Sequence, residues 1–203
     1  MLQDFEKRTK EQLFWDWFKS NSERYYILDM EDESMFDELI SRLKDIDKNL
    51  TFEMGPAGND GVREFIISAD GIVESFSSVI NLVGLAPALK KWKVVAFRPR
   101  VKGDDIMVEY GDDLLLSYDD IFFKYFPDSN KIGVELHIRD YGDSEDIDSA
   151  VFILLDSLIG EFDMEMEIGW IDRTILNEDN LDDLLPLLEL RKIVDNNKVR
   201  HQN

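Results

Sequence analysis

The chain has 203 residues, of which 44 are Asp or Glu and 23 are Lys or Arg, so its formal net charge is −21. With 44% hydrophobic residues and only 11 Gly and 5 Pro, the composition excludes disordered and collagen-like proteins and allows a sizeable core. The charge excludes nucleic acid as an expected partner, because binding to phosphates draws its affinity from Lys and Arg.

The first 49 residues are predicted to form a pair of helices. Phe14, Phe18 and Tyr25 recur at helical spacing, and a second apolar stripe covers residues 36–46. Trp15 and Trp17 cannot both point inward on a regular helix. One of them is therefore expected to be exposed, and Trp15 is a candidate for a contact with a partner or a second copy; packing onto a sheet is the other interpretation.

Residues 50–100 have the pattern of a β-hairpin followed by a helix and a third strand. Strand-like runs at 50–54 and 62–69 flank the turn-rich GPAGNDG of 55–61, helical spacing covers 72–85, and 92–98 is again strand-like. The glycine-bearing loop lacks the Lys-Ser or Lys-Thr that follows a phosphate-binding loop, so we interpret it as a hairpin turn.

The same pattern recurs in residues 121–173, after connecting strands in 101–120. Its expected strands are 121–126, 132–138 and 164–171, with a helix over 146–158. Residues 174–203 are expected to form a helical C-terminus that ends in a frayed polar tail from residue 195.

These elements predict a single α+β domain over residues 1–203. We expect an antiparallel or mixed sheet with helices on one face, built from two β-hairpin-helix-strand units that share the sheet, plus the N-terminal helical pair. Similarity between the two units is one of topology, since few residues are identical.

The strongest candidate site comes from alternation along two of the expected strands. On 132–138, Glu135 and His137 face away from the apolar set. On 164–170, Glu165 and Glu167 face away from an apolar set that comprises Met164, Met166, Ile168 and Trp170. If the strands pair, these four side chains share one face and form a group able to bind a divalent metal or perform acid–base chemistry. A solvent-facing polar sheet surface is the simpler interpretation.

A basic stretch, KKWKVVAFRPRVK, covers residues 90–102 of this otherwise acidic chain. Arg98 and Arg100 in it are candidates for an anion site if their guanidinium groups project together. Neutralisation of acidic side chains on neighbouring strands is the interpretation that we favour.

Four segments span much of the chain: FWDWF at 14–18, REFIISADG at 63–71, WKVVAFRPR at 92–100 and AVFILLDSLIGEFD at 150–163. Together they resemble a family of bacterial proteins of about this length whose function is uncharacterised. The resemblance implies a bacterial, cytosolic setting and carries no activity, cofactor or catalytic residue.

The sequence also favours a cytoplasmic protein without a membrane partner. No stretch approaches the about 18 apolar residues of a membrane-spanning helix, and the N-terminus lacks the features of an export signal. Zero cysteines fit a reducing compartment and exclude thiolate catalysis and cysteine metal sites.

We therefore expect a non-catalytic binding protein, without a cofactor, that meets a basic protein partner through an acidic surface. An immunity or antitoxin-like role is one concrete form, and the chain is expected to be a monomer or homodimer. This hypothesis rests on residues 101–203, which contain 26 acidic and 9 basic residues, and on the lack of a recognisable catalytic motif. The alternative is a metal-assisted hydrolase that uses Glu135, His137, Glu165 and Glu167.

Overall fold

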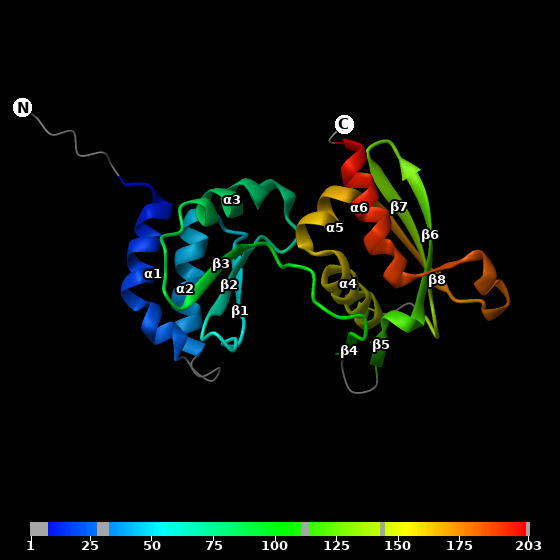
Figure 1. Ribbon diagram of the computed structural model, residues 1–203, viewed down its shortest axis with the longest axis horizontal. Helices are drawn as coiled ribbons and strands as arrows, with labels where there is room; N and C mark the ends of the chain where they lie inside the picture. Colours follow the sequence, from blue (N-terminus) through cyan, green and yellow to red (C-terminus); the bar gives the residue numbers. More distant parts are fainter. Residues whose placement is uncertain (1–7, 28–32, 111–113, 143–144, 202–203) are drawn as a thin grey trace, which may run out of the picture. The chain divides into compact units, whose positions relative to one another are not determined.

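The computed structural model describes residues 8–27, 33–110, 114–142 and 145–201 (Figure 1). The chain divides into two compact units, Met1–Arg98 and Pro99–Asn203. Each unit has its own cluster of buried hydrophobic side chains, where the sequence led us to expect one domain. At about 100 residues, each unit has the size at which a domain can bury a core of its own.

The first unit contains the predicted helical pair followed by the first hairpin-helix-strand. In chain order its elements are α1 (Lys10–Tyr26), α2 (Glu33–Ile46), β1 (Thr51–Met54), β2 (Arg63–Ser68), the 3-10 turn η1 (Val73–Ser75), α3 (Phe76–Gly84) and β3 (Trp92–Ala96). The sheet has the order β1-β2-β3, with β1 antiparallel and β3 parallel to β2. The predicted hairpin and crossover helix are confirmed.

Aromatic side chains fill the core of the first unit. Phe18 of α1 stacks on Phe65 of β2 with ring centroids 4.6 Å apart, and Trp92 of β3 meets Phe18 edge-on at 5.6 Å. The apolar stripe of α1 therefore packs on the sheet, as its helical spacing predicts.

The second unit repeats this topology in a separate sheet. Its elements in chain order are β4 (Met107–Tyr110), β5 (Leu114–Ser117), η2 (Tyr118–Asp120), β6 (Ile121–Asp128), β7 (Lys131–Ile138), α4 (Glu145–Ile159), α5 (Glu161–Glu167), β8 (Ile168–Ile175), η3 (Glu178–Asp183), β9 (Leu185–Pro186), η4 (Leu187–Glu189) and α6 (Leu190–His201). The main sheet has the order β8-β7-β6-β9, with β6 antiparallel and β8 parallel to β7; β4 and β5 form a hairpin. The expectation that the two units share one sheet is therefore wrong, whereas the α+β class with mixed sheets is confirmed.

The helices α4, α5 and α6 lie on the same side of the main sheet of the second unit (Figure 1). The buried side of α4, which includes Leu154 and Leu158, joins the core cluster with Val134 and Leu136 of β7. Helices on one face of a sheet are what the expected fold class requires.

The C-terminus is a helix where the sequence led us to expect a frayed tail. Leu190 and Val194 of α6, four residues apart, are fully buried in the core of the second unit. Asp195 and Lys198 form ion pairs with Arg100 and Asp163, so polar residues of the expected tail hold the helix in place. Within the described ranges, no helix has the length and apolar character needed to cross a membrane.

Candidate functional site

The main sheet of the second unit has a face that lies opposite α4, α5 and α6. Alternation along the strands places on it side chains from β6, β7 and β8. We call this surface the open face and define it as Phe122, Lys124, Phe126, Gly133, Glu135, His137, Trp170, Asp172 and Thr174.

An exposed aromatic pair lies at one end of the open face. The rings of Phe126 and Trp170 are stacked, with centroids 5.6 Å apart and an interplanar angle of 25°. Both residues are in register with Gly133 of β7, which lies between them. They remain 42% and 37% exposed, so the pair presents a large apolar surface to solvent.

Gly133 is the residue that permits this arrangement. A Cβ atom added to Gly133 would lie 2.1 Å from Cε2 of Trp170, far inside van der Waals contact. The indole therefore lies directly against the backbone of β7, which only glycine allows.

Polar side chains occupy the open face beside the aromatic pair. The Nε2 atom of His137 is 2.8 Å from Oε1 of Glu135, and both side chains are only partly exposed. Asp172 and Thr174 of β8 lie beside Glu135 and His137 in the parallel register. The prediction that Glu135 and His137 lie opposite the apolar side of their strand is confirmed, since Leu136 and its apolar neighbours along β7 are buried.

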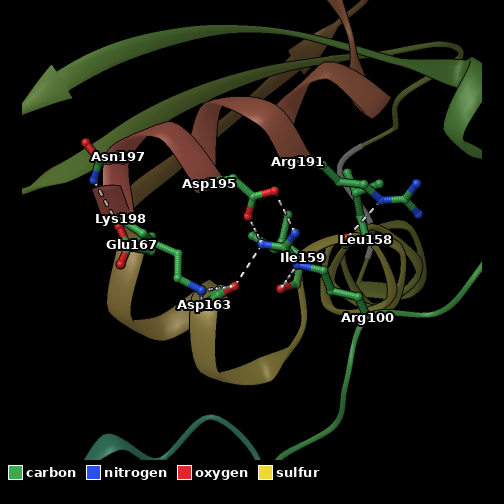
Figure 2. Close-up of polar contacts among 9 residues, drawn as sticks. All are labelled: Arg100, Leu158, Ile159, Asp163, Glu167, Arg191, Asp195, Asn197 and Lys198. Carbon is green, nitrogen blue, oxygen red and sulfur yellow. Dashed lines mark hydrogen bonds and ion pairs between the residues drawn. The ribbon is translucent and has the colours of Figure 1, made fainter. Parts of the chain in front are cut away.

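Glu165 and Glu167 do not join this group. The strand expected from residue 164 begins at Ile168, and both glutamates belong to α5, on the helical side of the sheet. Glu167 Oε2 accepts a hydrogen bond of 2.9 Å from Asn197 of α6 (Figure 2). The predicted four-residue cluster is therefore wrong, because Met164 and Ile168, four residues apart, suit a helical turn as well as they suit an alternating strand.

The environment of Glu165 is acidic and partly buried. Burial raises the pKa of its carboxyl above the ordinary value, and the charges of Asp156 and Glu161 act in the same direction, while Lys131 opposes them. Across the described ranges, no group of three or more His, Asp or Glu side chains is placed to hold a metal ion. The geometry therefore offers no support for a metal site built on these residues.

Arg100 is the centre of a polar network in the second unit (Figure 2). Its Nη2 atom donates to Asp163 at 2.8 Å and to Asp195 at 2.7 Å, and its Nε atom donates to the carbonyl of Ile159 at 3.0 Å. Lys198 also donates to Asp163, at 2.7 Å. The hydrogen bonds from Arg100 hold the pKa of Asp195 below its ordinary value.

This network joins the C-terminal end of α4 to α6. Arg191 of α6 donates to the carbonyl of Leu158 at 3.1 Å, next to the carbonyl that Arg100 satisfies. Two guanidinium groups thus bind carbonyls in the last turn of α4, where positive charge is favourable. Because Arg100 donates its hydrogen bonds to groups within the unit, its contacts fit the neutralisation of acidic side chains better than they fit an anion site.

Arg98 is paired in the same manner within the first unit. Its Nη1 atom lies 3.0 Å from Oδ1 of Asp70 and its Nε atom 3.8 Å from Oε1 of Glu53. In the same basic stretch, Lys93 forms an ion pair of 2.7 Å with Glu64, its neighbour in register across β2 and β3. These contacts support the interpretation that the basic stretch neutralises acidic side chains.

Trp15 is a core residue. It is only 3% exposed, and its Nε1 atom donates a hydrogen bond of 2.7 Å to the carbonyl of Leu82 in α3. Trp17 is the partly exposed member of the pair, and the guanidinium of Arg42 lies 4.2 Å from the centre of its ring. The expectation that Trp15 forms an exposed contact is therefore wrong; edge packing against Phe14 and Phe18 accommodates it in the core.

Sequence reasoning missed the aromatic pair and Asp172. We expected Trp170 to share a face with Ile168, but an irregularity in the β7–β8 register between Ile132 and Gly133 turns Trp170 to the opposite side. The signal in the sequence was Gly169 directly before Trp170, because a glycine inside a strand often marks a bulge.

Comparison with known proteins adds no relative: no family model, curated protein or solved structure matches the chain.

Proposed function

We propose that the second unit is a protein-binding module whose open face holds a basic partner protein. The observation that carries this proposal is the exposed, stacked pair of Phe126 and Trp170 on a sheet face that also bears Glu135 and Asp172. Exposed aromatic side chains next to charged groups are typical of the residues that dominate binding energy in protein interfaces.

The charge of the second unit indicates the nature of the partner. Residues 99–203 contain 26 acidic and 10 basic residues, a net charge of −16, whereas residues 1–98 contain 18 acidic and 13 basic residues. A surface of this charge accelerates encounter with a basic protein and repels acidic ones. Inhibition of a basic toxin, as in immunity proteins and antitoxins, is one form that such binding takes.

The rigidity of the aromatic pair supports its role as an anchor. Trp170 is held between the ring of Phe126 and the backbone at Gly133, so little side-chain freedom remains to be lost when a partner binds. The alternative of a metal-assisted hydrolase loses its geometric basis, because Glu165 and Glu167 lie on α5.

The test is a pull-down from the source cell with three forms of the full chain as bait. Trp170→Ala should lose the partner that the unmodified chain recovers, since removal of a central interface tryptophan costs about 2 kcal/mol or more, roughly a 30-fold loss of affinity. Phe162→Ala is the matched control, because Phe162 is similarly exposed, at 39%, but belongs to α5.

Binding should also weaken as salt is raised, since screening acts on exposed charges. A protein that is retained equally by the unmodified chain and by Trp170→Ala, or whose binding is insensitive to salt, would argue against the proposal.

A further inference from the structure

The outer edge of β8 is free in the part of the chain that the structure describes. β8 has eight residues and pairs with β7 along one side, and no described strand pairs with its other side. Alternate residues of such an edge direct backbone N–H and C=O groups outward, which makes it a template for another strand. β8 contains neither Lys nor Pro, two residues with which proteins commonly block an edge, and its register irregularity lies at its start, so that Trp170 to Ile175 forms a regular edge.

The two sides of this edge differ in chemistry. On the open face, β8 presents Trp170 and Asp172, which are both exposed. A strand added here would place every second side chain next to these two residues. Lys or Arg suits those positions, because a cation can pair with the carboxylate and lie against the indole.

On the helical side, the same edge combines exposed apolar side chains with an ion pair formed within the unit. Ile175 at the end of β8 is 60% exposed and Phe152 of α4 is 45% exposed. Phe152 lies near the strand, because the guanidinium of Arg173 is 5.5 Å from the centre of its ring while Arg173 pairs with Asp148 at 2.8 Å. Because the charge of Arg173 is already paired with Asp148, apolar residues that cover Ile175 and Phe152 suit the remaining positions of an added strand.

We propose that the partner binds by adding an extended segment, in which basic and apolar residues alternate, to the free edge of β8. This inference rests on the proposed function and specifies how the partner is held. A second copy of the chain is a poorer occupant, because each second unit carries a net charge of −16 and its edge carries Asp172. Like charges brought together across a strand pair are destabilising.

The experiment titrates the full chain with nine-residue synthetic peptides in which valine alternates with lysine. Two further peptides carry N-methyl groups on the valines only or on the lysines only, which removes the N–H donors from one edge of the extended peptide or from the other. A fourth peptide has glutamate in place of lysine. For each peptide we measure its affinity for the chain and the rate of hydrogen exchange of the β8 amides.

Strand addition uses only one edge of the peptide. The peptide methylated on the unused edge should therefore bind like the unmodified one. The peptide methylated on the edge that pairs with β8 should bind at least about tenfold more weakly, because it loses several backbone hydrogen bonds. The glutamate peptide should not bind, and the β8 amides should exchange more slowly in the complex. Asp172→Lys should weaken binding of the lysine peptide several-fold, and Glu109→Lys, the same change on exposed Glu109 of β4, should leave it unchanged.

Equal binding of both methylated peptides, or unchanged exchange of the β8 amides, would overturn strand addition. So would failure of the lysine peptide to bind, or self-association of the chain through β8. These results test only how the partner is held. The proposed function is tested separately, by the effect of Trp170→Ala on recovery of the partner.

Discussion

Replacement of Gly133 by alanine tests whether the aromatic pair of the open face depends on the absence of a side chain on β7. The new Cβ atom would lie 2.1 to 2.4 Å from three atoms of the Trp170 indole. Carbon atoms in contact are separated by about 3.5 to 4.0 Å, so the indole must move by more than about 1 Å. Because the indole is the far end of a side chain that is 37% exposed, the new Cβ atom is expected to push it toward solvent, away from β7.

The energetic consequence follows from two opposing contributions. Loss of the stacking between Trp170 and Phe126 costs about 0.5–1.5 kcal/mol. Replacement of glycine inside a strand gains about 0.5–1 kcal/mol, because the unfolded chain loses conformational freedom. The free energy of unfolding should therefore lie between a loss of about 1 kcal/mol and a gain of about 0.5 kcal/mol, while affinity for the partner falls about as far as in Trp170→Ala.

The decisive measurement is urea unfolding of Gly133→Ala in two backgrounds. With Trp170 present the substitution should change stability within that range, and in a Trp170→Ala background it should stabilise by about 0.5–1 kcal/mol, because the obstructing ring is gone. Gly55→Ala is the control, since its Cβ atom would lie at an ordinary 3.8 Å from Cβ of Glu64. The same effect in both backgrounds, or a loss above about 3 kcal/mol, would refute this account of the open face.

Two further predictions concern stability. Trp15→Phe removes the N–H donor that binds the carbonyl of Leu82, so the free energy of unfolding measured in urea should fall by about 1–2 kcal/mol. Trp17→Phe is the control and should cause a smaller loss. Equal losses would contradict the core position of Trp15. Burial, aided by the charge of Glu161, raises the pKa of Glu165 above 4.5, so the folded chain holds this proton more tightly than the unfolded chain does. Stability from this group is therefore lost as pH rises above 4.5, and the gain in melting temperature of Glu165→Gln over the unmodified chain should grow between pH 4 and pH 7; a constant difference would count against it.

The hairpin-helix-strand units were predictable because their signals are local. Alternation along 132–138 identifies both the buried side of β7 and the side that bears Glu135 and His137, whatever the strand pairs with. The turn at 55–61 was also predictable, because its hydrogen bonds join residues close together in the sequence; for example, Gly58 N donates to Val62 O at 2.8 Å.

The boundary between α5 and β8 was not predictable from the same signals. Met164 and Ile168 fit both a helical and an alternating pattern, and the choice between them depends on contacts distant in sequence, such as those from Asn197 to Glu167 and from Lys131 to the carbonyl of Glu165. Because a strand was expected from residue 164, Glu165 and Glu167 were assigned to the wrong side of the sheet and Trp170 was not recognised as part of the open face.

The sequence by itself determined the two hairpin-helix-strand units, the α+β class and the acidity of the second unit, because periodicity, turn residues and charge are properties of short segments. Only the tertiary structure decided that the two hairpin-helix-strand units form separate sheets with separate cores, that α6 continues where a tail was expected, and that Phe126, Gly133 and Trp170 meet on one face. These features arise from pairing between segments far apart along the chain, and no local pattern specifies which partner a strand or helix finds.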